Sequence, residues 1–505
     1  MWDFLIQGFA VALTPLNLWL AFLGALIGTL FGALPGIGPI NGIAILMPLA
    51  YTMGLPAESS LILLAAIYTG SEYGGRMSSI LLNVPGDAGA VFTTLDGYPL
   101  AQQGLAGPAL GISAVSSFIG ATLAILGITL FAPLLAKAAV MFGPAEFFAL
   151  MVFAFASMSA MMGKDPLKTV IGAVLGVLIV TVGVDSGTGV LRFTFGMPEL
   201  YDGIDFVVLI IGLFAISEIL LMLEQSHRHD GDDAMAPIGR VMVRWKEVLF
   251  TNGATLRAGL IGFVIGVLPG TGASVAGAVA YTTEKRLSDK NGTFGKGDMR
   301  GLAAPESANN AAAVGAFVPM LTLGVPGSGT TAVMLGALML YNITPGPMMF
   351  TQHPEVAGGL IASLYIGNLM LLLLNLPLAG LFARVLTIPR WLLVPSIAIF
   401  ALVGVYQLHS NLTAIYLMLI VGVIGYLLRK LGFSLAPIIL GYVLGGLMEQ
   451  NLRRALAISG GDTGILWQSG ISIGLWVGAA MLIILPWLLP WLWRKRNVVG
   501  CSSGK

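Results

Sequence analysis

The sequence Leu34-Pro35-Gly36-Ile37-Gly38 returns in the second half of the chain as Leu268-Pro269-Gly270-Thr271-Gly272. A second pair of motifs follows in the same order and at nearly the same spacing. It pairs Asn83-Val84-Pro85-Gly86-Asp87-Ala88-Gly89 with Gly324-Val325-Pro326-Gly327-Ser328-Gly329-Thr330. Because two motifs recur in order at nearly equal spacing, we predict a two-fold internal repeat. Its predicted parts are a first membrane repeat (1–224), a polar cytoplasmic junction (225–256), a second membrane repeat (257–493) and a cytoplasmic tail (494–505).

The composition around these motifs is that of a membrane protein. Of 505 residues, 57% are hydrophobic and only 10% are charged, whereas soluble domains carry about 25% charged residues. One membrane-spanning helix needs roughly 20 apolar residues. We therefore predict an all-α polytopic integral membrane protein with about 10–13 membrane segments. The clearest apolar stretches are 16–34, 105–135, 145–162, 167–184, 204–223, 356–383, 410–428 and 469–492.

Charge and cysteine content exclude several other classes of protein. The net charge of +1 gives no indication of a nucleic-acid partner. Cys501 is the sole cysteine, so we expect neither a disulfide framework nor a thiolate metal site. No Lys or Arg precedes Arg76, so the basic region of a cleavable signal peptide is missing. We expect the first apolar segments to act as uncleaved targeting signals.

The distribution of basic residues predicts how the two halves are oriented. Residues 1–224 hold 5 of the 25 Lys and Arg residues, and cytoplasmic loops carry the excess of basic residues. Basic loops flank the segment 258–282 on both sides, which predicts a re-entrant hairpin with Pro269-Gly270 at its tip. The matching segment 20–54 has no basic flank, as expected for an inverted-topology repeat. A plain membrane span kinked at Pro269 is the alternative. Arg494-Lys495-Arg496 predicts a cytoplasmic C-terminus.

The four Pro-Gly motifs are where we expect the functional site. Irregular backbone at membrane depth is tolerated only where it lines a cavity or a ligand site. Helix N-termini suit a carboxylate, and unwound carbonyl groups suit Na⁺. The substrate-binding candidates are Asn41, Arg76, Ser79, Asn83, Gly86, Thr93, Thr94, Asn309, Asn310, Gly327, Ser328, Thr330 and Thr331. The cation-coupling candidates are Glu72, Asp87, Pro35, Gly36, Pro269 and Gly270, with Na⁺ as a possible metal whose ligands stay open. Other polar residues near the motifs are Ser78, Asp96, Ser274, Glu306 and Ser307.

Purely structural explanations, which need no ligand, compete with this interpretation. Ser and Thr side chains commonly hydrogen-bond within their own helices, and Pro-Gly can mark a turn at the membrane surface. Two further charged clusters are interpreted as solvated loops and not as metal sites. They are His227, His229, Asp230, Asp232 and Asp233 in the junction, and Glu199, Asp202 and Asp205 before it.

The motifs also resemble those of one transporter family. Residues 305–312 (PESANNAA) and 323–329 (LGVPGSG) are similar to the large membrane subunit of tripartite tricarboxylate transporters. Further similar motifs are Tyr73-Gly74-Gly75, 80–86 (ILLNVPG), 96–99 (DGYP) and Pro345-Gly346-Pro347. The resemblance extends from about residue 15 to 490. It implies a bacterial inner-membrane symporter that takes up citrate or other carboxylates, coupled to Na⁺ or H⁺. The implied partners are a small four-helix membrane subunit and a periplasmic solute-binding protein.

Two positions depart from the family pattern. Arg76 stands where a small hydroxyl residue often follows Tyr-Gly-Gly, and Asp87-Ala88-Gly89-Ala90 is not the commonest form of its motif. A dicarboxylate or an aromatic carboxylate therefore stays open as the substrate.

Other functional classes fit less well. The chain has no phosphate-binding loop of an ATP-driven pump. Outside the junction, only His353 and His409 could serve an intramembrane enzyme, and no His-Glu-x-x-His motif occurs. We predict neither an enzyme nor a cofactor. A passive anion channel would share the broken helices and remains an alternative.

Overall fold

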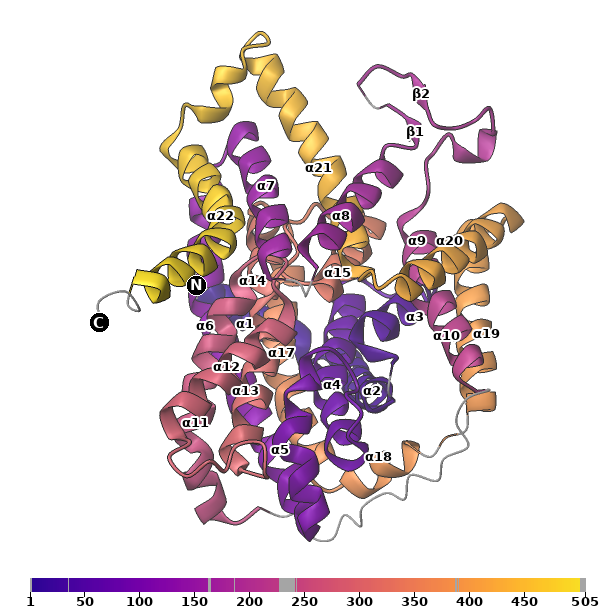
Figure 1. Cartoon of the computed structure of the whole chain (residues 1–505). Helices are drawn as coiled ribbons and strands as arrows, with labels where there is room; N and C mark the ends of the chain where they lie inside the picture. The colour runs from indigo at the N-terminus through magenta and orange to yellow at the C-terminus, as the bar shows by residue number, and fades with distance from the viewer. Residues whose placement is uncertain are drawn as a thin grey trace.

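The computed structural model is almost entirely helical (Figure 1). It describes residues 2–34, 36–161, 165–185, 187–226, 241, 243–386, 388 and 390–499. Pro35, the cluster His227, His229, Asp230, Asp232 and Asp233, and Cys501 lie outside these residues. Among the described helices, seven are long and apolar enough to cross a membrane. The predicted all-α polytopic membrane fold is therefore confirmed.

The first half of the chain runs from α1 to α10. Its helices are α1 (Trp2–Ala12), α2 (Pro15–Ala33), α3 (Gly38–Thr52), α4 (Ala57–Leu82), α5 (Thr93–Leu100), α6 (Ala106–Ala139), α7 (Pro144–Met161), α8 (Pro166–Val180), α9 (Phe206–Ile210) and α10 (Ser217–Ser226). Short 3₁₀ or π turns join them: η1 (Gly89–Val91), η2 (Ala101–Leu105), η3 (Pro198–Leu200) and η4 (Ile211–Ile216). Strands β1 (Gly183–Val184) and β2 (Leu191–Arg192) pair antiparallel in a small hairpin between α8 and α9.

The second half runs from α11 to α22. Its helices are α11 (Trp245–Val267), α12 (Gly272–Ser288), α13 (Met299–Gly315), α14 (Phe317–Leu323), α15 (Gly329–Leu340), α16 (Met349–Gln352), α17 (Pro354–Asn375), α18 (Ala379–Val385), α19 (Arg390–His409), α20 (Leu412–Lys430), α21 (Ala436–Ile458), η5 (Thr463–Trp467) and α22 (Gly470–Val499). Helix α11 begins at Trp245, inside the stretch predicted as the junction.

The apolar stretches of the sequence correspond to helices with two differences. Trp245–Val267 and Trp391–His409 are long apolar helices that lie outside the clearest predicted stretches. The stretch 356–383 is not one helix, because α17 ends at Asn375 and α18 starts at Ala379. Four further apolar helices are shorter than a full span: Pro144–Ala160, Pro166–Val180, Gly329–Leu340 and Gly470–Ile484. The number of membrane segments stays a prediction.

Glycine lets one helix pair in each half approach at backbone distance. A Cβ atom on Gly28 would lie 2.3 Å from the carbonyl oxygen of Ile67, so α2 touches α4 directly. A Cβ on Gly262 would lie 2.3 Å from the carbonyl oxygen of Ala308, so α11 touches α13 in the same way. Small residues allow this packing between membrane helices. Gly28 and Gly262 are separated by the same number of residues as the first pair of sequence motifs. Ile67 and Ala308, the residues they contact, are separated by the same number as the second pair.

The second pair of repeated motifs interrupts the helices after α4 (residues 83–89) and after α14 (residues 324–330). These two breaks also share one backbone geometry. Asn83 ends α4 in the left-handed conformation (φ 58°), and Gly324 ends α14 in the same way (φ 67°). In the first half the N–H of Val84 donates to the carbonyl of Ser78. In the second half the N–H of Val325 donates to the carbonyl of Pro319. The internal repeat is thus visible in local geometry at matching positions. Its orientation relative to the membrane stays a prediction.

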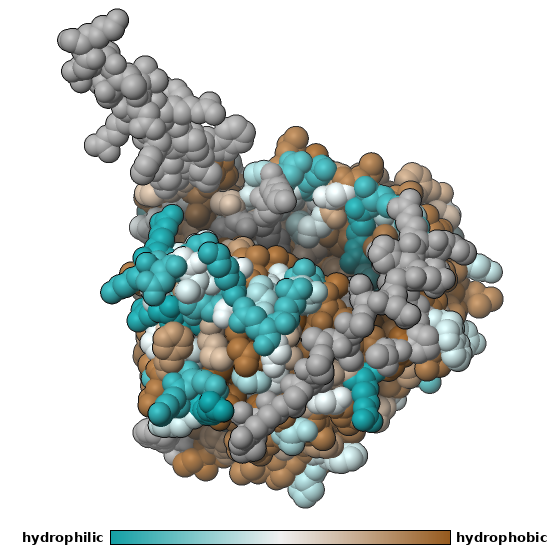
Figure 2. All heavy atoms as spheres, turned by 60° about the horizontal axis from the view of Figure 1, so that its bottom comes forward, coloured by the Kyte–Doolittle hydropathy of each residue, from teal (hydrophilic) through white to brown (hydrophobic). Residues whose placement is uncertain are grey.

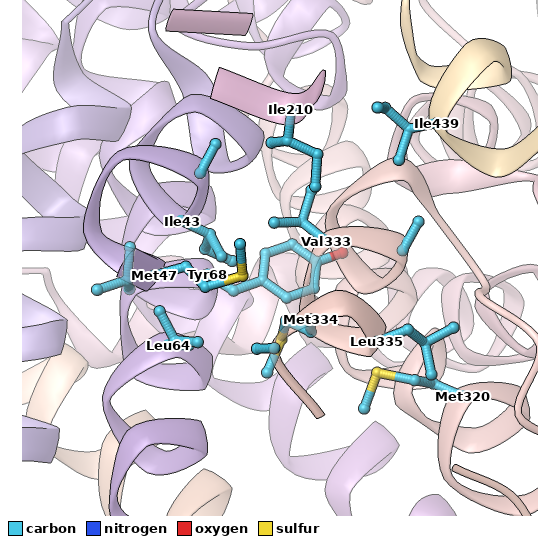
Figure 3. Packing of buried hydrophobic residues seen from close by; sticks show 14 of the residues in the cluster. Ile43, Met47, Leu64, Tyr68, Ile210, Met320, Val333, Met334, Leu335 and Ile439 are labelled. Carbon is cyan, nitrogen blue, oxygen red and sulfur yellow. The ribbon is translucent and has the colours of Figure 1, made fainter. Parts of the chain in front are cut away.

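The largest buried apolar cluster joins the two halves. Figure 3 shows the ring of Tyr68 on α4 between Ile43 and Met47 of α3 and Val333 and Met334 of α15. All of these side chains are at most 1% exposed. Helix α4, which precedes the first break, and helix α15, which follows the second, therefore share one continuous core.

A second connection between the halves lies at the lower end of the molecule. Figure 2 turns this end toward the viewer and shows hydrophilic side chains grouped among apolar ones. Asp96 of α5 is fully buried and accepts the backbone N–H groups of Gly295, Gly297 and Asp298 at 2.8–2.9 Å. Its other carboxylate oxygen accepts the hydroxyl of Tyr281 at 3.0 Å. Asp96 therefore holds the loop between α12 and α13.

We expect Asp96→Asn to lower the free energy of unfolding by about 1.5–3 kcal/mol, because hydrogen bonds to a charged acceptor are worth about that much. Chemical denaturation in detergent measures this loss, and limited proteolysis should cut residues 289–298 faster. Glu199→Gln is the control, because Glu199 is an exposed acid in another loop. Equal stability of the two variants would contradict the role assigned to Asp96.

The β1–β2 hairpin is tied to α21 by charge. Asp185 accepts a hydrogen bond from the guanidinium of Arg453 at 2.8 Å and from the backbone N–H of Gly187 at 2.8 Å. The N–H of Gly187 and the charge of Arg453 lower the pKa of Asp185 to about 2. Arg192 and Glu449 complete the cluster, 2.8 Å apart. The hairpin is therefore anchored to α21, through its turn and strand β2, by ionised side chains at neutral pH.

Candidate functional site

Polar side chains from both halves meet beside the break after α4. Glu72 lies on α4 and is 4% exposed. Asn309 lies on α13, is 1% exposed, and donates a hydrogen bond to Glu72 Oε2 at 2.8 Å. The amide of Asn309 also lies against the break, because a Cβ on Gly89 would be 2.0 Å from its Oδ1 atom. A side chain of the second half thus reaches the break of the first.

Asp87 is the acid inside this break. Its Oδ1 atom accepts the backbone N–H of Ala90 at 2.9 Å, whereas its Oδ2 atom is buried without a hydrogen-bond partner. Asp87 lies against α4 and the start of α3. A Cβ on Gly75 of α4 would be 2.6 Å from Asp87 Oδ2, and a Cβ on Gly38 of α3 would be 3.6 Å from the Cβ of Asp87. We refer to Glu72 and Asp87 together as the acid pair.

A separate buried carboxylate, Glu306, accepts hydrogen bonds at both of its oxygen atoms. Its Oε2 atom accepts the hydroxyls of Ser113 and Ser117 on α6 at 3.0 and 3.1 Å. Its Oε1 atom accepts the hydroxyl of Thr93. Arg76 donates to Ser117 at 3.5 Å and attracts Glu306 electrostatically. These five residues form the Glu306 cluster, in which one guanidinium compensates one carboxylate.

Arg76 has further contacts on the side of α17. It donates to Asn375 Oδ1 at 3.2 Å, and its guanidinium carbon lies 4.7 Å from the centre of the Tyr73 ring. Arg76 is 1% exposed. The structure therefore gives Arg76 protein partners on α4, α6 and α17, and its predicted contact with substrate stays a prediction.

The break after α14 has hydroxyl groups in place of acids. Ser328 caps α15 by accepting the backbone N–H of Thr331 at 3.2 Å, and the Thr331 hydroxyl accepts the N–H of Ser328 at 2.8 Å. The hydroxyl of Tyr68 on α4 lies 3.3 Å from Ser328 Oγ. Thr330 is buried in the same turn. This break is thus reached by a side chain of the first half.

The remaining candidates make mostly local contacts. Ser79 donates to the carbonyl groups of Gly75 and Ala90, and Thr94 donates to Val91. Asn310 donates to the backbone of Glu306. These hydroxyl and amide contacts fit the purely structural explanation, in which such side chains hydrogen-bond to nearby backbone.

The other candidates shape the breaks. Asn41 Nδ2 donates to the carbonyl of Gly36 at 3.2 Å, while its Oδ1 atom is buried without a partner. Gly86 packs on Gly75, and Gly327 packs on Ala316. Gly270, at the tip between α11 and α12, packs on Met158. The carbonyl of the neighbouring Pro269 accepts the hydroxyl of Ser157. Ser78, Ser274 and Ser307 lie in α4, α12 and α13, and Asn83 ends α4.

The acidic loop before α9 borders a cavity. Glu199, Asp202 and Asp205 line a space of about 690 Å³ together with His409. Asp205 also caps α9 by accepting the N–H of Val207. Among the described residues, no group of three or more His, Cys, Asp or Glu side chains could hold a metal ion.

Several residues of the site were not found from the sequence. Ser113, Ser117 and Asn375 lie within apolar helices, and no local pattern marks which helix face meets Glu306. Tyr68 had a usable signal, because it precedes Asn309 by the same spacing that separates the second pair of repeated motifs. That spacing could have identified Tyr68 and Asn309 as equivalent positions.

Comparison with known sequences identifies the family. The sequence model of the tripartite tricarboxylate transporter TctA family matches residues 18–440. The chain belongs to the TctA family. The resemblance inferred from the motifs is thus confirmed, and the protein is a multi-pass membrane component of a tricarboxylate transporter.

Two relatives of the TctA-family chain come from Agrobacterium vitis. An uncharacterised 52.8 kDa protein in the TAR-I ttuC' 3' region is 42% identical over 496 residues, which cover 97% of each chain. An uncharacterised protein in the TAR-II ttuC' 3' region is 44% identical over 238 residues, covering 47% of this chain and 98% of that protein. No solved structure is significantly similar to the chain.

Proposed function

We propose that this TctA-family chain is the large subunit of a binding-protein-dependent symporter that imports carboxylates with Na⁺ or H⁺. The observation that supports this most directly is the pair of breaks, one in each half of the chain. One break presents the acid pair, which suits a cation, and the other presents hydroxyl groups at the N-terminus of α15, which suit a carboxylate. A symporter needs both kinds of site close together.

We further propose that the two helix hairpins enter the membrane from opposite faces. Lys285 and Arg286 in the last turn of α12 and Lys290 and Lys296 after it are exposed, and such basic residues favour the cytoplasmic side. The α2–α3 hairpin carries no basic residue. An inverted-topology repeat of this kind supports alternating access by movement of one half against the other.

The proposed cycle starts on the periplasmic side of the inner membrane. A loaded solute-binding protein docks on this chain and its small four-helix partner, and the carboxylate passes to the break after α14. A cation binds at the break after α4. Movement of one half relative to the rest then opens the site to the cytoplasm. Citrate-like tricarboxylates are the first substrates to test, followed by dicarboxylates and aromatic carboxylates.

Uptake into proteoliposomes tests this proposal. The vesicles contain the chain and its small membrane partner, with the binding protein outside and an inward Na⁺ or H⁺ gradient. We expect one radiolabelled carboxylate of the panel to accumulate above its external concentration, and only when the binding protein is present. Equilibration without accumulation, whatever the gradient and binding protein, would show a passive anion channel instead.

A further inference from the structure

The segment around strand β2 exposes a group of large apolar side chains. Phe193 and Phe195 are 58% and 83% exposed, and Val190 and Met197 are exposed in the same short segment. Thr194, between the two phenylalanines, is buried. Single apolar residues on a surface are normal, whereas a group of them marks an interaction surface. We refer to Val190, Phe193, Phe195 and Met197 as the apolar loop patch.

The backbone of the apolar loop patch is strained. Phe193 and Phe195 have φ angles of 53° and 51°, in the left-handed region that bulky residues rarely occupy. Asn or Gly would adopt the same backbone at lower cost. Both phenyl rings are exposed, so packing inside the chain does not account for the choice of Phe. Strained residues of this kind cluster where function requires them.

The length of α8 places this segment at the edge of the bilayer. In the first turn of α8, Lys168 donates to the carbonyl of Leu431, the residue after α20. Helix α8 therefore starts level with the end of a helix that is long enough to span the membrane. The two helices have 15 and 19 residues, which rise about 22 and 28 Å. Because the hydrocarbon core is about 30 Å thick, α8 ends near its far edge, and strand β1 begins three residues later.

Helix α21 marks the same level. A Cβ on Gly446 would lie 3.6 Å from the side chain of Val180, the last residue of α8. The apolar part of α21 ends at this level, because a polar run starts one turn later with Glu449. Glu449 pairs with Arg192 of strand β2 at 2.8 Å. This ion pair holds the β1–β2 hairpin where α21 leaves the apolar layer, and Phe193 follows Arg192 directly.

The outer face of α8 continues toward the apolar loop patch. Leu167, Val174 and Leu178 are exposed apolar residues of α8, as expected where a helix faces lipid. Figure 1 shows the β1–β2 hairpin beyond the end of α8. The patch thus extends a lipid-facing surface to the level at which charged side chains begin. This continuity favours lipid over a protein partner as its occupant.

We infer that the apolar loop patch inserts into the membrane interface and fixes the α8–α21 pair at a constant depth in the bilayer. Phe side chains bury readily at the boundary between headgroups and acyl chains, and interfacial anchors of this kind set the position of neighbouring helices. The ion pairs of the hairpin keep its charged side chains with α21. This inference does not depend on the proposed transport.

Spin labels on the full chain in nanodiscs of phosphatidylcholine and phosphatidylglycerol test the insertion. Cys501, the sole cysteine, is first replaced by serine. Single labels are then placed at Phe195→Cys, at Leu178→Cys on the outer face of α8, and at Glu199→Cys in the exposed acidic loop. Oxygen concentrates in lipid, whereas a nickel chelate stays in water. We expect the oxygen-to-nickel collision ratio at Phe195→Cys to approach that at Leu178→Cys and to exceed that at Glu199→Cys roughly tenfold.

A label at Met197→Cys tests whether the two rings are the anchor. Phe193→Asn combined with Phe195→Asn removes both rings and keeps a backbone that Asn tolerates. The hairpin should stay folded while the label moves into water, so nickel collisions should rise roughly threefold. Ser410→Asn is the control, because it makes the same change at a left-handed residue outside the patch. It should leave the label at Met197→Cys as it was.

Three results would overturn the inference. Nickel collisions as frequent at Phe195→Cys as at Glu199→Cys would show a patch in water, free for a protein partner. Protection of Phe195→Cys from both reagents would show that protein covers the patch. An unchanged label at Met197→Cys after loss of both rings would show that the rings do not anchor the hairpin.

Discussion

Replacing Glu306 by alanine is expected to lower the free energy of unfolding by about 3–5 kcal/mol, the usual cost of leaving a buried charge uncompensated. The variant leaves the guanidinium of Arg76 without its compensating charge. It also leaves the hydroxyls of Thr93, Ser113 and Ser117 without their common acceptor. Denaturation of the purified protein in detergent measures the loss, and the amount of folded protein in the membrane should fall with it.

A double variant separates charge from packing. Glu306→Gln retains an acceptor for the hydroxyls but leaves Arg76 charged, so it should be less stable than the wild type. Adding Arg76→Met removes the unpaired charge, and this double variant should recover part of the stability, since paired removal of buried charges is often nearly neutral. Additive losses in the double variant would contradict a charge pair between Arg76 and Glu306.

Gly32→Ala is expected to impair both stability and transport. Its Cβ would lie 1.9 Å from the carbonyl oxygen of Ser71, a backbone atom that cannot rotate away. Overpacking of this kind costs about 1–3 kcal/mol, occasionally more. Because Ser71 directly precedes Glu72, the shift would also displace the acid pair, and carboxylate uptake should fall further than the stability. The equivalent Gly266→Ala, 2.4 Å from the carbonyl oxygen of Ala312, should destabilise the protein similarly.

Gly367→Ala is the control for both glycine variants. Gly367 lies within α17, and a Cβ there would meet nothing within 4 Å. Alanine at this site should stabilise the helix by roughly 0.5–1 kcal/mol. Thermal unfolding of the three purified variants should therefore give two lowered midpoints and one that is unchanged or raised. Loss of stability in Gly367→Ala of the same size would show that the close contacts of Gly32 and Gly266 are not the cause.

The sequence predicted the fold class well, because long apolar stretches and repeated Pro-Gly motifs are local signals. The order and spacing of the repeated motifs also predicted which positions share a backbone geometry, as Asn83 and Gly324 do. The interruption after Asn375 was missed although Pro377, a helix breaker, follows it closely, because hydropathy alone set the bounds of the stretch. Hydropathy measures composition and does not record where a helix stops.

The candidate site was predictable only in part. Glu72, Asp87 and Asn309 were candidates from their places near the motifs, and the structure brings them together. The contacts of Arg76 and Glu306 with α6 and α17 could not be predicted, because they depend on which helix faces meet across long sequence separations. Arg76 was predicted to bind substrate, but the carboxylate that acts on it electrostatically is Glu306 of the protein itself.

Coupled transport is tested most directly with substrate at equal concentration on both sides of a proteoliposome membrane. The vesicles hold this chain and its membrane partner, the loaded binding protein is outside, and an inward Na⁺ gradient or an inward H⁺ gradient is imposed in separate experiments. We expect net inward movement of the carboxylate, which ceases when an ionophore dissipates the gradient. Absence of net movement under either gradient, in vesicles that exchange labelled substrate, would contradict a symporter.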